Sequence, residues 1–220
     1  MDYKFIETIT LDFDFGKLLS VDFNLNYGNL YAVNLTDNIV NEIIDCIQNE
    51  GFPDFIWFKG IRTALKHKKC KEIVKKVKKI YPNQKIGIYL NCELFQDVNL
   101  RKDFHKYDLV AINLNTVDPI NFSKINQCSD SVDSKEVLEG IKEFRKKFNG
   151  NLGIYSLFLH GINDNRENLE SLKIFLLKTM PDHFSISTYT LNGFEPISKE
   201  FKNQVKETFR YLPFKVYYRF

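Results

Sequence analysis

Short runs of apolar residues alternate along the chain with segments in which apolar residues recur on one helix face. The segment 55–58, with the sequence FIWF, is a continuous apolar run typical of a strand buried on both faces. Val137, Ile141, Phe144 and Phe148 recur at helical spacing. The alternation predicts right-handed βαβ units around a parallel sheet. We expect strands at 19–25, 55–58, 85–90, 107–114, 152–159, 183–189 and 214–220, and helices at 38–49, 68–80, 98–105, 134–148, 165–178 and 201–211.

The number of these units limits the fold. About six strand–helix units fit into the 220 residues, whereas a closed eight-unit barrel usually needs about 250 residues. We therefore expect a single domain over residues 1–220 with an α/β fold, a partial, TIM-like (βα)6 barrel with a parallel sheet. A doubly wound sheet is the less favoured alternative, because no glycine-rich dinucleotide fingerprint follows the first expected strand.

Composition and charge narrow the class of protein. The chain is 44% hydrophobic and 15% aromatic, which supports a folded core and argues against disorder. The net charge of +3 is too small to indicate a nucleic-acid partner by itself. The first residues do not resemble a signal peptide, and no apolar run approaches the length of a membrane span. The sequence thus predicts a cytoplasmic protein with reduced cysteines and no membrane partner.

Cysteines and histidines give no sign of a metal site. The four cysteines contain no C-x2-C pair, so neither a zinc site nor a disulfide framework is expected. No two histidines have metal-ligand spacing. Cys92 follows a predicted strand end, where we favour a buried structural cysteine over a reactive thiol. His160 also ends a strand, and a hydrogen-bonded structural role is favoured over one in a cavity. The residues concerned are Cys46, Cys70, Cys92, Cys128, His67, His105, His160 and His183.

One predicted helix carries an unusual lysine-rich face. Between residues 68 and 80 the apolar positions form one stripe, and seven lysines lie elsewhere on the helix. A solvated outer face is the favoured interpretation, and a nucleic-acid site is the alternative. The lysines are Lys68, Lys69, Lys71, Lys75, Lys76, Lys78 and Lys79.

A series of motifs between residues 107 and 168 occurs in a recognisable order. YDLVAINLNT at 107–116 is followed by NFSKIN at 121–126, VLEGI at 137–141 and HGIND at 160–164. Their order and spacing resemble the radical SAM superfamily, in particular the archaeal and bacterial iron-sulfur oxidoreductase group related to wyosine tRNA-modification enzymes. The resemblance covers most of the chain from Phe15 onward and implies a partial barrel of the radical SAM type.

The cysteine loop that defines this superfamily lacks its cysteines here. In the family, the loop after the first strand carries C-x3-C-x2-C, three thiolates that hold a 4Fe-4S cluster. The same spacing falls here on Tyr27, Tyr31 and Asn34, which offer no soft sulfur ligand. The resemblance therefore implies a degenerate member, a pseudoenzyme without the 4Fe-4S cluster or reductive cleavage of S-adenosylmethionine. Tyr27 and Tyr31 are expected to pack over the former cluster cavity.

Further departures from the family lie at the ends of the expected strands. Where the family has a Gly-Glu-Pro-Thr-like motif that meets the methionine end of S-adenosylmethionine, this chain has Gly60, Ile61, Arg62 and Thr63. A Thr-Asn-Gly motif is replaced by Leu90-Asn91-Cys92, and a Ser-Leu-Asp-like triplet at the ribose side by Asn113-Leu114-Asn115. Chemistry in (βα) folds gathers at these ends. The resemblance thus implies that a ligand would contact Gly60, Arg62, Thr63, Asn91, Asn113 and Asn115.

Arg62 is the most distinctive of these residues. Its guanidinium group can hold a carboxylate or a phosphate with two parallel hydrogen bonds. A salt bridge to a neighbouring loop, for example through Glu93 or Asp118, is an equally weighted alternative.

Three functional hypotheses follow, and none of them assigns a catalytic residue. The first is a non-catalytic radical-SAM-like protein that binds a small ligand or a partner protein, such as an intact radical SAM paralogue. The second is an enzyme or ligand-binding protein that reuses the barrel cavity, with S-adenosylmethionine or a related nucleoside as a candidate ligand. The third and least favoured is an RNA-associated protein that uses the lysine-rich helix.

Overall fold

The computed structural model describes residues 6–10, 16–23, 35–189 and 195–220. The chain divides into two compact units. The first comprises Met1–Leu90 and Lys106–Leu109, and the second comprises Asn91–His105 and Val110–Phe220. The single domain expected over residues 1–220 stays a prediction.

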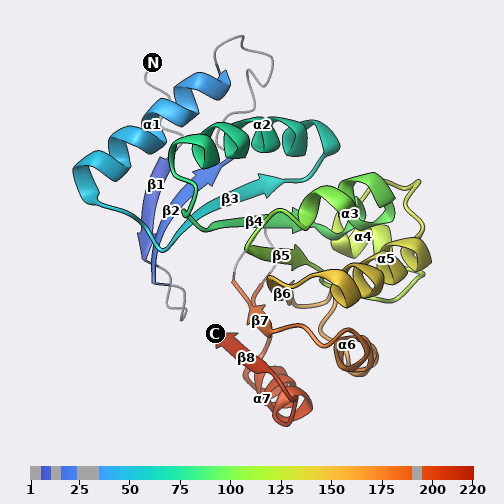
Figure 1. Cartoon of the computed structure of the whole chain (residues 1–220). Helices are drawn as coiled ribbons and strands as arrows, with labels where there is room; N and C mark the ends of the chain where they lie inside the picture. Colours follow the sequence, from blue (N-terminus) through green and yellow to red (C-terminus); the bar gives the residue numbers. More distant parts are fainter. Residues whose placement is uncertain (1–5, 11–15, 24–34, 190–194) are drawn as a thin grey trace. The chain divides into compact units, whose positions relative to one another are not determined.

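The described part of the first unit contains four strands and two helices. The strands β1 (Ile6–Thr10), β2 (Lys17–Asp22), β3 (Phe55–Ile61) and β4 (Ile86–Asn91) are neighbours in chain order, although Asn91 itself belongs to the second unit. The β1–β2 pair is antiparallel, and the β2–β3 and β3–β4 pairs are parallel. The helices α1 (Leu35–Glu50) and α2 (Ala64–Ile80) lie beside each other on one side of these strands (Figure 1).

The core of the first unit follows the apolar pattern of the sequence. Ile56 and Phe58 of β3 are completely buried, as expected for a strand covered on both faces. The buried stripe of α2 consists of Cys70, Ile73 and Val77, which recur at helical spacing. The sheet and the helix thus bury their apolar surfaces against each other, which supplies most of the driving force for folding.

The second unit continues the alternation of strands and helices. It contains the short 3-10 helix η1 (Cys92–Gln96), the helix α3 (Val98–Phe104), the strand β5 (Leu109–Asn113, with Leu109 in the first unit) and the helix α4 (Phe122–Asn126). It goes on with α5 (Ser134–Lys147), β6 (Asn151–Leu157), α6 (Arg166–Thr179), β7 (His183–Ser187), α7 (Lys199–Phe209) and β8 (Lys215–Arg219). The β6–β7 and β7–β8 pairs are parallel. The strands again lie in chain order (Figure 1).

Most expected elements are present, with boundaries shifted by a few residues. Trp57, Ile88, Ile112 and Ile154 lie in β3, β4, β5 and β6, which confirms the strand predictions. The sequence analysis did not predict β1, η1 or α4, which are all five residues long. The helix expected at 38–49 begins three residues earlier than predicted. Because α1 begins at Leu35, Asp37 lies in its first turn and forms an ion pair with Lys76 of α2.

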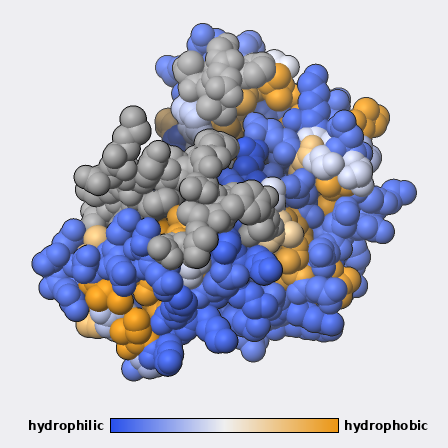
Figure 2. Space-filling model, turned by 90° about the horizontal axis from the view of Figure 1, so that it is seen from above, coloured by the Kyte–Doolittle hydropathy of each residue, from blue (hydrophilic) through white to orange (hydrophobic). Residues whose placement is uncertain are grey.

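The surface carries both hydrophilic and apolar groups. On the face drawn in Figure 2, hydrophilic residues predominate and hydrophobic residues occur in small separate groups. Among the described residues, no helix combines the length and the apolar character needed to cross a membrane.

Gly140 in α5 offers a test of how closely α5 and η1 pack. A Cβ at this position would overlap the Phe95 carbonyl oxygen of η1 and lie 2.5 Å from Nη1 of Arg101. Helix propensity alone favours alanine over glycine. We expect the clash to reverse this preference, so that Gly140→Ala lowers the free energy of unfolding by about 1–3 kcal/mol. Urea denaturation measures this, with the exposed Lys146→Ala in the same helix as a control. Unchanged or increased stability of Gly140→Ala would contradict the packing.

Candidate functional site

In the first unit, three of the predicted ligand contacts lie at the carboxyl end of β3. Gly60 has a φ angle of +79° at an irregularity in the β3–β4 pairing, a conformation that favours glycine. Arg62 follows β3 directly and is half-buried. Thr63 is the N-cap of α2, where its Oγ1 accepts a hydrogen bond of 3.3 Å from the backbone N–H of Lys66. The turn therefore brings Arg62 to the amino end of a 17-residue helix.

Charged side chains gather around this turn. Lys59 of β3 lies 3.2 Å from the carboxylate of Asp22, which ends β2. Lys66 of α2 is only 8% exposed. Burial lowers the pKa of Lys66, the positive charge of Arg62 lowers it further, and the negative charge of Asp22 acts in the opposite direction. Arg62 and Lys66 are therefore close enough for each charge to affect the other.

This arrangement suits an anion. Arg62, Lys66 and Lys59 place three positive charges at this turn, and the carboxylate of Asp22 acts on Lys66 in the opposite direction. The amino end of α2 adds a partial positive charge of its own. A carboxylate or phosphate group would relieve the repulsion between Arg62 and Lys66, and a cationic group would increase it. Sequence reasoning missed Lys66, because a lysine in a lysine-rich helix gives no signal of burial.

In the second unit, Asn115 is the centre of a dense hydrogen-bond network. Its side chain accepts from the backbone N–H of Leu157 at 2.9 Å and donates to the carbonyl oxygen of Ile125 at 3.2 Å. Its own carbonyl oxygen accepts from Nδ2 of Asn163 at 3.1 Å and from Nδ2 of Asn168 at 3.2 Å. These partners come from α4, the end of β6, the loop after β6 and the start of α6. Asn115 therefore ties several loops of the second unit together.

Asn126 extends this network toward β4. Its Oδ1 accepts from the backbone N–H groups of Asn115 and Thr116, at 2.6 and 3.2 Å, and its Nδ2 donates to the carbonyl oxygen of Thr116 at 2.8 Å. Asn91 caps η1 through Glu93 N–H and donates to the carbonyl oxygen of Asn126 at 3.4 Å. The structure thus brings Asn91 and Asn115 together around Ile125 and Asn126, the last two residues of α4. Sequence reasoning missed Asn126, because nothing in its local pattern marks a buried amide.

The remaining predicted residues of the second unit have separate surroundings. Asn113 is the half-buried last residue of β5. Glu93, one of the proposed salt-bridge partners of Arg62, accepts from Ser129 N–H at 3.0 Å, and Asp118, the other, accepts from Nδ2 of Asn121 at 2.9 Å. His160 is hydrogen-bonded as favoured from the sequence, with Nδ1 2.7 Å from Asp164. The role of Asn113 as a ligand contact stays a prediction.

Two of the four cysteines lie close together in the second unit. Cys92, at the start of η1, and Cys128, after α4, have their Sγ atoms 3.7 Å apart. The sequence analysis treated these cysteines as separate, because they are 36 positions apart on different predicted elements. Cys46 and Cys70 belong to the helices α1 and α2 of the first unit, and Cys70 lies 3.7 Å from the hydroxyl group of Tyr107.

A 4Fe-4S cluster does not fit the residues that the structure describes. Such a cluster is held by several thiolates at one place, and only Cys92 and Cys128 come together in this part of the chain. Within the described ranges, no group of three or more His, Cys, Asp or Glu side chains could hold a metal ion. Tyr27, Tyr31 and Asn34, at the spacing of the family's cluster cysteines, lie outside the described residues.

The lysine-rich face of α2 is partly neutralised within the first unit. Lys69 pairs with Glu72 at 3.3 Å, Lys76 pairs with Asp37, and Lys78 pairs with Asp108 at 3.5 Å. Carboxylates at these positions oppose the approach of a phosphate backbone, so the surroundings favour the solvated face over a nucleic-acid site.

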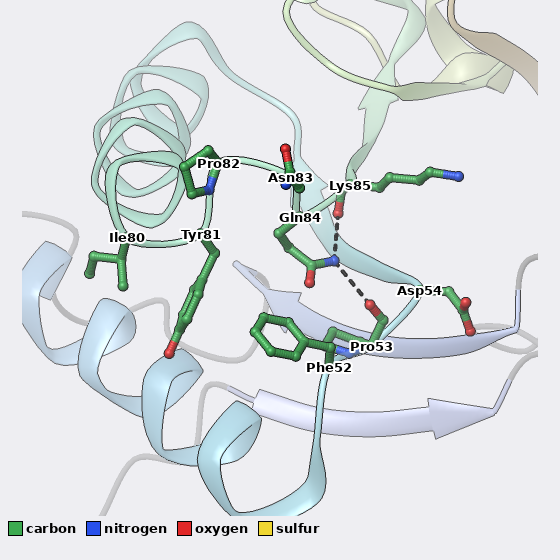
Figure 3. Close-up of a pocket in the computed structure, with 9 residues that line it drawn as sticks. All are labelled: Phe52, Pro53, Asp54, Ile80, Tyr81, Pro82, Asn83, Gln84 and Lys85. Carbon is green, nitrogen blue, oxygen red and sulfur yellow. Dashed lines mark hydrogen bonds between the residues drawn. The ribbon is translucent and has the colours of Figure 1, made fainter.

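A separate pocket of about 470 Å³ lies near the amino ends of β3 and β4 (Figure 3). The rings of Phe52 and Tyr81 stand edge to face in it, with their centroids 5.3 Å apart. The buried side chain of Gln84 donates from Nε2 to the carbonyl oxygens of Pro53 and Lys85, both at 3.1 Å. This pocket is at the opposite end of β3 from Arg62, so it does not belong to the predicted ligand site.

The Asn126 amide provides a direct test of the network. Asn126→Asp keeps the size of the side chain and the Oδ1 acceptor but replaces the donor to Thr116 with an oxygen. Two buried oxygens would then face each other, so we expect the free energy of unfolding to fall by about 1–3 kcal/mol. The exposed Asn99→Asp, which gains a charge in the first turn of α3, should be neutral or slightly stabilising. Equal effects of the two substitutions in urea denaturation would argue against the network.

Comparisons with curated proteins reveal distant sequence relatives. The chain is 28% identical over 163 residues to a protein named GTPase Obg from Brachyspira hyodysenteriae, a match that spans 74% of this chain and 23% of that protein. It is 24% identical over 193 residues to a UPF0026 protein from Helicobacter pylori, spanning 79% of this chain and 62% of the relative. The chain thus covers less than two thirds of either relative. No family model matches the chain.

Solved structures give the clearer similarity. A domain of pyruvate-formate lyase-activating enzyme from Bacteroides vulgatus aligns with a TM-score of 0.60 at 15% identity, covering 74% of this chain and 97% of that domain. A radical SAM methyltransferase from Sphaerobacter thermophilus aligns with a TM-score of 0.59 at 14% identity, covering 84% of this chain and 57% of the enzyme. These alignments confirm the expected fold class: the chain has the parallel α/β fold of radical SAM enzymes.

Proposed function

We propose that this radical-SAM-like protein has lost the cluster-dependent chemistry of its fold and binds a small anionic ligand. The observation that carries the proposal is the pair of cations, Arg62 and the largely buried Lys66, at the carboxyl end of β3 and the amino end of α2. Burying an ammonium group beside a guanidinium group costs free energy, and a bound anion offsets that cost.

The resemblance to the family supports an anion at this place. There the corresponding motif carries an acidic residue and meets the methionine end of S-adenosylmethionine, which includes an ammonium group. Here the acidic residue is missing and Arg62 stands next to its position. This change in charge favours the carboxylate of a methionine-like or nucleoside ligand, or a phosphate group.

The loss of the cluster rests on the chain's own donor atoms. The family's thiolate positions fall on Tyr27, Tyr31 and Asn34, and the described cysteines come together only as one pair. The protein would act in the cytoplasm as a ligand-binding protein, and a complex with an intact radical SAM paralogue is part of the same proposal.

Calorimetric titration with S-adenosylmethionine, S-adenosylhomocysteine and inorganic phosphate tests the anion site. The two nucleosides carry the carboxylate and phosphate does not, so the three probes distinguish the two anions. For any probe that binds, Arg62→Ala should weaken the affinity by about 10- to 150-fold, which corresponds to about 1.5–3 kcal/mol for hydrogen bonds to a charged group.

Two further variants make this test specific. Arg62→Lys keeps the charge but loses the bidentate geometry, so its affinity should lie between those of the wild type and Arg62→Ala. Lys75→Ala removes an exposed charge from the same helix and should change the affinity less than about twofold. The proposal is wrong if none of the three probes binds at millimolar concentration, or if Arg62→Ala and Lys75→Ala have equal effects.

Iron reconstitution tests the loss of the cluster. Protein treated anaerobically with iron and sulfide should show no 4Fe-4S absorption and should not cleave S-adenosylmethionine reductively, because three convergent thiolates are needed. A radical SAM enzyme that retains the C-x3-C-x2-C motif, treated in parallel, serves as the positive control. A stoichiometric cluster in this chain would overturn the pseudoenzyme interpretation, whatever the result for Arg62.

A further inference from the structure

Cys92 and Cys128 form an isolated pair of thiols in the second unit. Their Sγ atoms are 3.7 Å apart, and no disulfide joins them. Cys92 is completely buried, whereas Cys128 is half-buried and has access to solvent. A disulfide bond is about 2 Å long, so a movement of less than 2 Å would bring the two sulfur atoms to bonding distance.

Hydrogen bonds hold the two cysteine-bearing segments against each other. Asn91, directly before Cys92, donates to the carbonyl oxygen of Asn126 at 3.4 Å. On the other side of Cys92, Glu93 accepts from Ser129 N–H at 3.0 Å. Contacts on both sides of each cysteine therefore keep the thiols together, and the pair does not depend on a chance rotamer.

The backbone around Cys128 is itself fixed. Gln127 has a φ angle of +54°, the left-handed conformation that ends α4, and Cys128 N–H donates to the carbonyl oxygen of Ser123 at 2.8 Å. The Cys128 thiol also lies 3.5 Å from Oδ1 of Asn91 and 3.7 Å from the carbonyl oxygen of Asn126. The backbone contacts thus hold the Cys128 side chain where its Sγ lies 3.7 Å from that of Cys92.

We propose that Cys92 and Cys128 are a redox modification site, at which a hydroperoxide converts the dithiol to a reversible disulfide. This inference is independent of the anion site at Arg62.

The reaction balances in two steps. The Cys128 sulfur attacks the peroxide, so that an S–O bond forms, the O–O bond breaks, and an alcohol or water leaves with the thiol proton. The Cys92 sulfur then attacks the Cys128 sulfenic acid, so that the S–S bond forms and the S–O bond breaks. The Cys92 proton leaves with the hydroxyl group as water. The two thiols lose two electrons, and the hydroperoxide gains them.

The surroundings assign the order of these steps. Burial raises the pKa of the Cys92 thiol, and the neighbouring Cys128 thiol raises it further, so Cys92 is a poor first nucleophile. Cys128 has the solvent access that a peroxide requires. Cys92, held 3.7 Å away, is the thiol that resolves the sulfenic acid.

The remaining cysteines act as internal controls. Cys70 is completely buried against Tyr107, and burial raises the pKa of its thiol. Cys46 is a half-buried residue of α1 in the first unit. Neither belongs to the unit that contains Cys92 and Cys128.

The test uses the full-length reduced protein and one equivalent of hydrogen peroxide. Thiols counted in denaturant should fall from the four of the sequence to two, and a reducing agent should restore all four. Peptide mapping should find one intramolecular link between Cys92 and Cys128. Four remaining thiols, a link to Cys46 or Cys70, or an irreversible loss would each overturn the proposal.

Variants assign a role to each thiol. Cys46→Ser should still lose two thiols, and Cys128→Ser should lose none. Cys92→Ala should form no disulfide and should accumulate a Cys128 sulfenic acid that dimedone traps. Labelling by dimedone at any other cysteine, or no labelling at all, contradicts the proposed order of steps. Since peptide mapping of the wild type needs no substitution, the proposal stays open to disproof even if Cys92→Ala fails to fold.

Discussion

Asn115 is the residue on which the loops of the second unit most depend. Its backbone N–H, its backbone oxygen and both ends of its side chain are all engaged, with partners at Ile125, Asn126, Leu157, Asn163 and Asn168. A buried polar atom that loses its partner costs more free energy than one hydrogen bond gains. The network is therefore cooperative: each amide that is satisfied fixes the position of the next. This network fixes the position of the end of α4, and therefore also that of Cys128, which follows two residues later.

In the first unit, the main constraint is the placement of the positive charges of α2. Its helix α2 places many lysines outward, where Asp37, Glu72 and Asp108 balance part of the charge. Lys66 instead is buried, close enough to Arg62 for the positive charge of Arg62 to lower its pKa, while Asp22 acts in the opposite direction. Lysines with perturbed pKa values are concentrated at functional sites. The two neighbouring cations Arg62 and Lys66 are thus the strongest functional signal in the first unit.

The spacing of apolar residues was enough to predict the fold, because each strand and helix buries the face on which its apolar residues lie. Ile56 and Phe58 in β3, or Val137, Ile141 and Phe144 in α5, are buried as their spacing predicts. The site was only partly predictable. Arg62 follows from its place at a strand end, but Lys66, Asn126 and the Cys92–Cys128 pair depend on contacts between distant segments, which no local pattern encodes. The short elements β1, η1 and α4 were missed, because five residues are too few for a periodic pattern of apolar positions to be recognised.

The two units differ in how the polar groups at their strand ends are used. At the strand ends of the second unit, amide groups that could face a ligand are instead bonded to the protein: the Asn91 side chain contacts Glu93 and Asn126, and that of Asn115 contacts Ile125 and Leu157. A ligand that used these amides would have to replace bonds already made, so its net gain would be small. The proposed function therefore places the ligand at Arg62 and Lys66, where two positive charges lie close together. Substitutions in the amide network should act mainly on stability, and those at the cation pair mainly on affinity.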